Sequence, residues 1–268
     1  MTLLKQTFSG MIWVFIDYFL LKGISFICAI LLARLLTPSD YGLIAMIAVI
    51  MTIGILIVES GLSSSLIRNF NNEENDYSTV FFYNLFLSLL LYTIFFILAP
   101  FISDFYDQPE LTSLIRVYCI SFIFIALNSV QTCILVKKMQ FKKLTLLNIP
   151  GIILGNSVGL FMGLNGYGVW SIVGTYLCIQ FFHTIALWFG SKWRPKLLFS
   201  SKKLKYHLKF GNKLLISSLI TGVYSNIYNI MLGKYYPLQT TGFFERAFTL
   251  SQYPLIVLTQ ITGKVSYP

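Results

Sequence analysis

The amino-acid sequence predicts an all-α integral membrane protein that crosses the bilayer several times. Of its 268 residues, 56% are hydrophobic and 11% are charged, whereas a soluble domain carries roughly 25% charged residues. The mean hydropathy is +0.73. Apolar runs of about 20 residues recur along the chain, and an α-helix of that length crosses a hydrocarbon core of ~30 Å. We therefore expect a multi-pass helical bundle.

Eight apolar segments are expected to span the membrane. Their ranges are 11–33, 41–64, 79–102, 111–136, 145–165, 168–190, 211–233 and 242–264. The connections are short and contain residues that end helices, among them Pro38, Pro109 and the Asn165-Gly166 turn. This pattern favours long helices joined by tight turns.

One of these turns occurs twice, at an offset of 200 positions. LARLLTPSDYGL (32–43) joins the first two segments, and LGKYYPLQTTGF (232–243) joins the last two. The aligned pairs are Leu32 with Leu232, Arg34 with Lys234, and Gly42 with Gly242. A proline lies in both turns, one place out of register. The repeat indicates two related units, which share one orientation because an even number of segments separates them.

Positive charge marks one side of the membrane. Most of the 20 lysines and arginines lie beside the N-terminus and in alternate connections, above all in the 191–211 loop. The positive-inside rule places the N-terminus and this loop in the cytoplasm. The expected division is a six-helix lobe at 1–190, a basic cytoplasmic linker at 191–211, and the first two helices of an incomplete second lobe at 212–268.

Two helix faces carry small or polar residues. The fifth segment has glycines at every fourth position, namely Gly151, Gly155, Gly159 and Gly163. Such a ridge lets a neighbouring helix approach closely, and a flexible hinge is the alternative. The seventh segment has a polar stripe of Ser218, Thr221, Ser225, Tyr228 and Asn229, with Asn226 beside it. Lipid disfavours such a stripe, so we expect it to face protein or a wet cavity.

No set of residues resembles a catalytic or metal centre. The sequence has no carboxylate pair at catalytic spacing, no nucleophile elbow and no phosphate-binding loop, and the four cysteines lack CxxC spacing. The basic residues are not accompanied by a nucleic-acid-binding motif. We expect no enzyme activity, no cofactor, no metal and no nucleic-acid partner.

Ionisable residues at membrane depth are the candidates for function, because each costs ~2.5–3.5 kcal/mol on insertion scales. Lys22 lies near the middle of the first segment, with Asp17 on the same helix and Glu59 at comparable depth in the second. One interpretation is an internal ion pair between helices, since an i,i+5 spacing is poor for a pair within one helix. The other places Lys22 in an aqueous cavity, where it attracts an anionic substrate.

The sequence resembles one family over essentially its whole length. The motifs are LARLLTPSDYGLIAM (32–46), ESGLSSSLIRN (59–69), FYDQPEL (105–111), KKMQFKKLTL (137–146), GYGVWSIV (166–173), KWRPKL (192–197), KFGNKLLISS (209–218) and TTGFFERAFTLSQYPL (240–255). In this order and spacing they are similar to the polysaccharide-transport branch of the multidrug/oligosaccharidyl-lipid/polysaccharide flippase superfamily. This branch contains the O-antigen and capsule repeat-unit flippases.

The resemblance implies a flippase in the bacterial cytoplasmic membrane, built as two helical lobes around a cavity. It implies a multi-pass helical transporter whose substrate is an undecaprenyl-pyrophosphate-linked oligosaccharide, moved by alternating access for surface polysaccharide or lipopolysaccharide synthesis. Membrane lipids and other polysaccharide-assembly membrane proteins are the expected partners. Cations lining the cavity are expected to attract the pyrophosphate, with Lys22 as first candidate and Arg246 second. Asn226 and Asn229 are further candidates for substrate binding in the cavity.

Three alternatives remain open at this stage. Full-length relatives have roughly 12–14 spanning helices, so we expect a truncated product, a frame-shifted gene or one half of a split gene, and a non-transporting remnant is one reading. Another exporter of the same superfamily is a second reading. A membrane polymerase is a third, although such an enzyme is expected to carry a sizeable periplasmic loop, and the longest loop here, 191–211, is basic and cytoplasmic.

Overall fold

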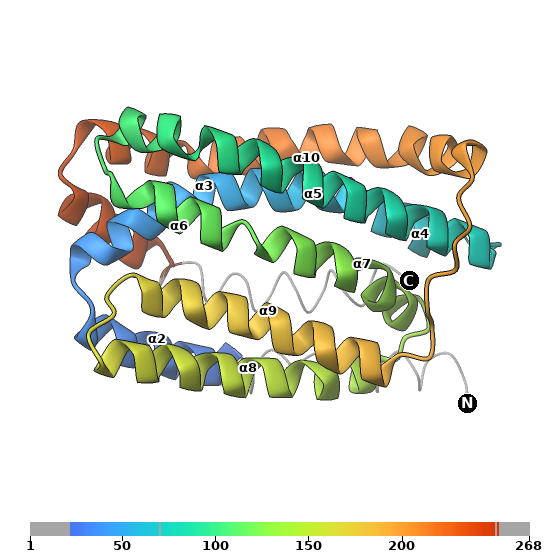
Figure 1. Cartoon of the computed structure of the whole chain (residues 1–268), viewed down its shortest axis with the longest axis horizontal. Helices are drawn as coiled ribbons and strands as arrows, with labels where there is room; N and C mark the ends of the chain where they lie inside the picture. Colours follow the sequence, from blue (N-terminus) through green and yellow to red (C-terminus); the bar gives the residue numbers. More distant parts are fainter. Residues whose placement is uncertain (1–21, 70, 250, 252–268) are drawn as a thin grey trace.

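The computed structural model describes residues 22–69, 71–249 and 251. All regular structure in these ranges is helical, as predicted (Figure 1). The labelled helices are α2 (Lys22–Leu35), α3 (Pro38–Glu59), α4 (Leu62–Arg68), α5 (Glu74–Tyr106), α6 (Glu110–Tyr118), α7 (Ser121–Lys137), α8 (Phe141–Leu164), α9 (Trp170–Gly190) and α10 (Ser201–Tyr235). A further helix occupies residues 238–249.

Six helical stretches of the described residues are long and apolar enough to cross a membrane. They are Pro38–Arg68, Glu74–Tyr106, Glu110–Lys137, Phe141–Leu164, Trp170–Gly190 and Ser201–Tyr235. These stretches confirm an all-α multi-pass membrane protein. The first expected segment is described from Lys22 onwards and the eighth is described to residue 249; their other residues lie outside the described part.

The turn sequences set where helices begin and bend. Thr37 caps α3, because its hydroxyl oxygen accepts from the Asp40 amide while the Asp40 carboxylate accepts from the Thr37 amide. Pro38 occupies the first turn of α3, where no N–H is needed. The second segment bends between α3 and α4, where Ser60 and Gly61 have positive φ angles of 46° and 62°.

The repeated turn has the same secondary structure in both copies. Helix α2 ends at Leu35 and α3 begins at Pro38. Helix α10 ends at Tyr235 and the next helix begins at position 238. The 200-residue offset seen in the sequence is therefore kept at the level of helix boundaries.

The basic segment 191–211 is only partly a loop. Residues 191–200 lack regular structure, but α10 begins at Ser201, so the last eleven residues of the expected linker are helical. The Ser200 side chain caps α10 by accepting from the Lys203 amide. Helix α10 therefore begins ten residues before the expected segment 211–233.

The glycines of α8 form a packing surface, as predicted for the ridge. A methyl group built on Gly155 would lie 2.8 Å from the Ile179 amide nitrogen and 2.9 Å from the Thr175 carbonyl oxygen, both on α9. One on Gly163 would lie 2.8 Å from a Leu32 methyl carbon on α2. Helices α2, α8 and α9 therefore form one layer (Figure 1).

Helix α10 packs lengthwise on α3 at the opposite side of the bundle, next to α5 (Figure 1). A methyl group on Gly222 would lie 2.8 Å from Leu56 Cδ1, and one on Gly233 would lie 3.0 Å from the Tyr106 ring. Helices α6 and α7 lie between the two layers, and the buried core around them contains Leu111, Leu114 and Phe122.

A buried polar cluster fixes the first turns of α10 to α4 and α5. His207 is 0% exposed, and its Nε2 donates to the Asp76 carboxylate at 3.2 Å. Its Nδ1 hydrogen-bonds the Ser65 hydroxyl at 2.8 Å. The Lys203 ammonium reaches Glu73 at 2.7 Å and Asp76 at 2.8 Å. The acidic start of α5 thus neutralises part of the basic segment.

Candidate functional site

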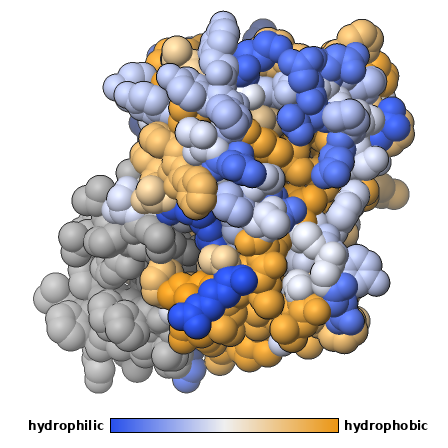
Figure 2. Space-filling model, turned by 90° about the vertical axis from the view of Figure 1, so that its left-hand side faces the viewer, coloured by the Kyte–Doolittle hydropathy of each residue, from blue (hydrophilic) through white to orange (hydrophobic). Residues whose placement is uncertain are grey.

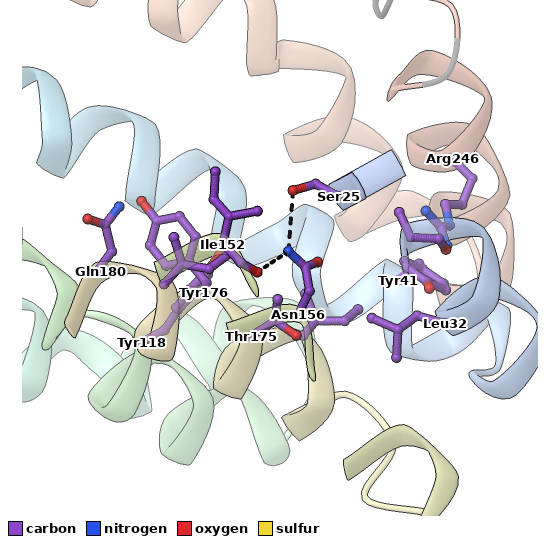
Figure 3. A pocket seen from close by; sticks show the side chains of 13 residues that line it. Ser25, Leu32, Tyr41, Tyr118, Ile152, Asn156, Thr175, Tyr176, Gln180 and Arg246 are labelled. Carbon is purple, nitrogen blue, oxygen red and sulfur yellow. Dashed lines mark hydrogen bonds between the residues drawn. The ribbon is translucent and has the colours of Figure 1, made fainter. Parts of the chain in front are cut away.

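A pocket of about 420 Å³ opens between α2, α3, α6, α8, α9 and the helix at 238–249 (Figure 3). Its lining residues are Ser25, Ala29, Leu32, Tyr41, Tyr118, Ile152, Asn156, Ile172, Thr175, Tyr176, Ile179, Gln180 and Arg246. Among these, Arg246 carries the only formal charge. The pocket therefore combines hydrogen-bonding groups and one cation inside an otherwise apolar bundle.

Arg246 is held at one end of the pocket by two contacts. Its guanidinium carbon lies 3.6 Å from the centroid of the Tyr41 ring, which is a cation–π arrangement. Its Nη2 donates to the Ala29 carbonyl oxygen at 2.9 Å. A guanidinium has five N–H donors in a planar fork. Donors therefore remain available for an anion that enters the pocket.

The opposite end contains neutral and aromatic groups. Figure 3 shows Gln180, Tyr176 and Tyr118 at the far side of the pocket from Arg246. The two tyrosine rings meet edge to face with centroids 5.0 Å apart. A side-chain hydrogen bond joins Gln180 to Tyr176, and Glu59 is close enough to interact electrostatically with Tyr176. The pocket is thus polarised, with the Arg246 cation at one end and uncharged aromatic and amide groups at the other.

Asn156 lies between the two ends. Its Nδ2 donates to the Ile152 carbonyl at 2.7 Å and to Ser25 Oγ at 3.4 Å (Figure 3). The first bond is within α8, and the second links α8 to α2. These bonds use the amide N–H groups, so the amide oxygen of Asn156 can accept from a ligand.

One of the two predicted cations lines the pocket, and the other is at the start of α2. Arg246, the second candidate, lines the pocket. Lys22, the first candidate, is the first residue of α2. It precedes Ser25 by one turn and Ala29 by two, so helical register puts its position on the same face as these two lining residues. Asp17 lies outside the described residues.

The other predicted residues lie apart from the pocket. Glu59 ends α3, is exposed, and forms no ion pair with any residue that the structure describes. Asn229 is buried and donates to Glu245 at 2.8 Å. Asn226 donates to the Gly222 carbonyl at 2.9 Å and to Thr52 at 3.4 Å. Both asparagines join helices, and their part in substrate binding stays a prediction.

Several pocket residues were not singled out from the sequence. Tyr41 lies in the repeated turn motif. Nothing in the sequence indicates that its ring contacts a cation 205 positions away. Asn156 and Gln180 are uncharged amides inside apolar segments. A polar residue at membrane depth is itself a functional signal, and it could have identified both positions.

The structure thus defines a class: a helical multi-pass membrane protein with an internal, polarised pocket. The chain belongs to the polysaccharide biosynthesis protein family, whose model matches residues 31–268. This match confirms the family resemblance predicted from the motifs.

Curated relatives are similar over nearly the whole chain. The teichuronic acid biosynthesis protein TuaB of Bacillus subtilis is 24% identical over 98% of this chain and 55% of its own length. The lipopolysaccharide biosynthesis protein WzxC of Escherichia coli is 23% identical over 100% of this chain and 55% of its own. The succinoglycan biosynthesis transport protein ExoT of Rhizobium meliloti is 22% identical over 90% and 49%. The chain spans about half the length of these relatives. No solved structure matches it.

Proposed function

We propose that this chain forms the substrate pocket of a flippase for lipid-linked oligosaccharides in surface polysaccharide synthesis. The observation that carries the proposal is Arg246, the one charged residue among the described residues that line the pocket. A relative is named as a succinoglycan biosynthesis transport protein, and two others are named for the synthesis of teichuronic acid and lipopolysaccharide. Transport, not catalysis, is the activity that we assign.

The pyrophosphate of an undecaprenyl-linked substrate would bind at Arg246. A guanidinium binds phosphate oxygens through two parallel N–H bonds, and such charge-assisted bonds are roughly twice as strong as neutral ones. Tyr41 and the Ala29 carbonyl hold the guanidinium in place before the substrate arrives. This preorganisation lowers the entropy cost of binding. Lys22 would supply a second cation on the same face of α2, about 10 Å along the helix from Ala29.

The sugar would extend toward the neutral end. Tyr118 and Tyr176 offer aromatic surface, and Gln180 and Asn156 offer amide groups for sugar hydroxyls. Among the residues that the structure describes, no cation lines that end of the pocket, so none there competes with Arg246 for an anion. The charge distribution of the pocket therefore favours one orientation of the ligand, with phosphate at Arg246 and uncharged sugar beyond it.

The proposed setting is the bacterial cytoplasmic membrane, with the N-terminus in the cytoplasm. Lysines and arginines concentrated beside α4, α7, α9 and the start of α10 support this orientation. Reporter fusions after Lys203 should give a cytoplasmic signal, and fusions after Ser39 a periplasmic one. A cytoplasmic signal at Ser39 would reverse the orientation. The lobe division at 190 and 212 remains part of the proposal.

Complementation of surface polysaccharide in a flippase-null strain tests the function. The open reading frame that encodes this chain should restore the surface polymer when it is expressed in such a strain. Arg246→Ala should reduce polymer by roughly tenfold at equal membrane abundance, because it removes a charge-assisted phosphate contact. Arg246→Lys should keep part of the activity. Lys234→Ala is the matched control, since this lysine pairs with Asp107 outside the pocket. Full complementation by Arg246→Ala would overturn the assignment.

The role of Lys22 is tested in the same strain. If it attracts substrate, Lys22→Ala should fold normally and lose transport, and Lys22→Arg should retain part of it. If it is a structural partner of Asp17 or Glu59, its loss should lower membrane abundance, and adding Asp17→Asn or Glu59→Gln should restore abundance. Abundance and polymer are therefore measured together.

A further inference from the structure

The segment between α9 and α10 is held in place at two points on α5. The Lys196 amide donates to Ser78 Oγ at 3.1 Å, and the Ser200 amide donates to Thr79 Oγ1 at 3.1 Å. Both hydroxyl groups belong to buried residues near the start of α5. The connection is therefore fixed to the helix bundle on either side of residues 197–199.

Between these two points the chain exposes three consecutive apolar residues. Leu197 is 94% exposed, Leu198 43% and Phe199 56%. The same segment can bury a side chain, because the Trp193 ring packs against Phe81 with centroids 5.9 Å apart. The two backbone contacts instead project the tip 197–199 outward. Exposed apolar clusters of this kind usually mark a contact surface.

The tip lies at the end of the bundle where one long apolar helix ends and the next begins. Helix α9 ends at Gly190 and α10 begins at Ser201, and both helices are long and apolar enough to span. Figure 1 shows the segment running beside the first turns of α5 and α10, not beyond them. Helix α10 is about 50 Å long, more than a hydrocarbon core of ~30 Å, and the lysines of its first turns favour a position of these turns outside that core.

The charges around the tip complement a lipid surface. Lys192, Lys196 and Lys202 flank it and are exposed, and Tyr206 follows one turn into α10 at 62% exposed. Aliphatic residues between lysines, with an aromatic residue nearby, form the pattern of an interfacial anchor. Glu74 pairs with Lys196 at 3.4 Å, and Lys192 and Lys202 add further positive charge on either side of the apolar tip.

We propose that residues 197–199 insert into the leaflet next to the starts of α5 and α10, with the flanking lysines at the level of the lipid phosphates. The anchor holds the connection between α9 and α10 at a fixed depth. It does not depend on the proposed transport function.

Fluorescence quenching in vesicles tests this anchor. Cys28, Cys119, Cys133 and Cys178 are replaced by serine or alanine, and Leu197→Cys is labelled with bimane. Because Leu197 is almost fully exposed, this change should not disturb folding. The protein is placed in vesicles of phosphatidylethanolamine and phosphatidylglycerol that contain a lipid spin-labelled near the headgroup. Asn71→Cys, at an exposed polar position in the loop before α5, is the matched control.

The proposal predicts that the lipid quencher acts about threefold more strongly at position 197 than at 71, and that aqueous iodide shows the reverse order. Iodide quenching at 197 equal to that at 71 would overturn the proposal, because the tip would then face water. Weak quenching by both agents would also overturn it, since the tip would then be covered by protein. Leu198→Cys, labelled in the same way, should repeat the result.

Discussion

Gly42 and Gly242 lie against each other where the two copies of the repeated turn meet. A methyl group built on Gly242 would lie 3.0 Å from the Gly42 amide nitrogen and would overlap the Pro38 carbonyl oxygen. One built on Gly42 would overlap the Leu238 carbonyl oxygen. Each glycine therefore permits the backbone of the other copy to approach. The contact joins α3 to the helix at 238–249 and brings Arg246 beside Tyr41.

Gly242→Ala should destabilise the fold, because the added methyl group meets backbone atoms that cannot rotate away. We expect a loss of about 1–3 kcal/mol in the free energy of unfolding, the usual cost of overpacking. Thermal unfolding of the purified protein measures it. Gly23→Ala is the control, because no atom lies within 4 Å of the added carbon there. Equal melting temperatures for the two variants would show that the turns do not touch.

Gly159→Ala in α8 should also destabilise the fold, but in a way that a second substitution can relieve. Its added methyl group would overlap the hydroxyl oxygen of Thr175, which belongs to a side chain. Adding Thr175→Ala should recover part of the lost stability. Gly155→Ala meets the backbone of α9 and should not be rescued by the same change. Rescue of both variants, or of neither, would contradict the packing described here.

The end of the bundle that carries the repeated turns shows what composition can and cannot predict. Figure 2 faces this end and shows hydrophilic residues gathered over part of it, with hydrophobic surface beside them. The turn sequences predicted where the chain reverses, because Thr37, Pro38 and Gly42 have local roles in capping and close approach. The presence of the long helices can likewise be predicted from local signals, namely apolar runs bounded by turn residues.

Contacts across long sequence distances were beyond such reasoning. Arg246 is the second cavity cation that the family resemblance implies, but its partner Tyr41 depends on how α3 meets a helix 200 residues later. The start of α10 was misplaced because the lysines of 201–211 resemble a loop. In the structure, Glu73 just before α5 and Asp76 in its first turn bind Lys203 and offset that charge.

The His207 cluster should contribute to stability. His207→Ala leaves the buried Ser65 hydroxyl and the Asp76 carboxylate without one of their partners. Such loss costs about 1–3 kcal/mol. Combining it with Ser65→Ala should cost less than the sum of the two single changes, because both remove the same hydrogen bond. Lys205→Ala, an exposed position nearby, is the control. Additive losses in thermal unfolding would show that the two residues do not interact.

Tyr41 should support anion binding through its ring. Tyr41→Leu removes the aromatic face beneath Arg246 and should weaken binding of undecaprenyl pyrophosphate about two- to thirtyfold, which corresponds to about 0.5–2 kcal/mol. Tyr41→Phe keeps the ring and should bind nearly as the wild type does. Both affinities can be measured by lipid titration of the protein in nanodiscs. If Phe weakens binding as much as Leu does, the hydroxyl and not the ring is the important group.

The most direct test of the pocket is a comparison of two lipids by native mass spectrometry of the purified chain. Undecaprenyl pyrophosphate and undecaprenol share a tail and differ in the charged group. The wild type should bind the pyrophosphate at least about tenfold more tightly, and Arg246→Ala should lose most of this preference while binding undecaprenol unchanged. Equal binding of both lipids by the wild type, or an undiminished preference in Arg246→Ala, would contradict the role that we propose for this pocket.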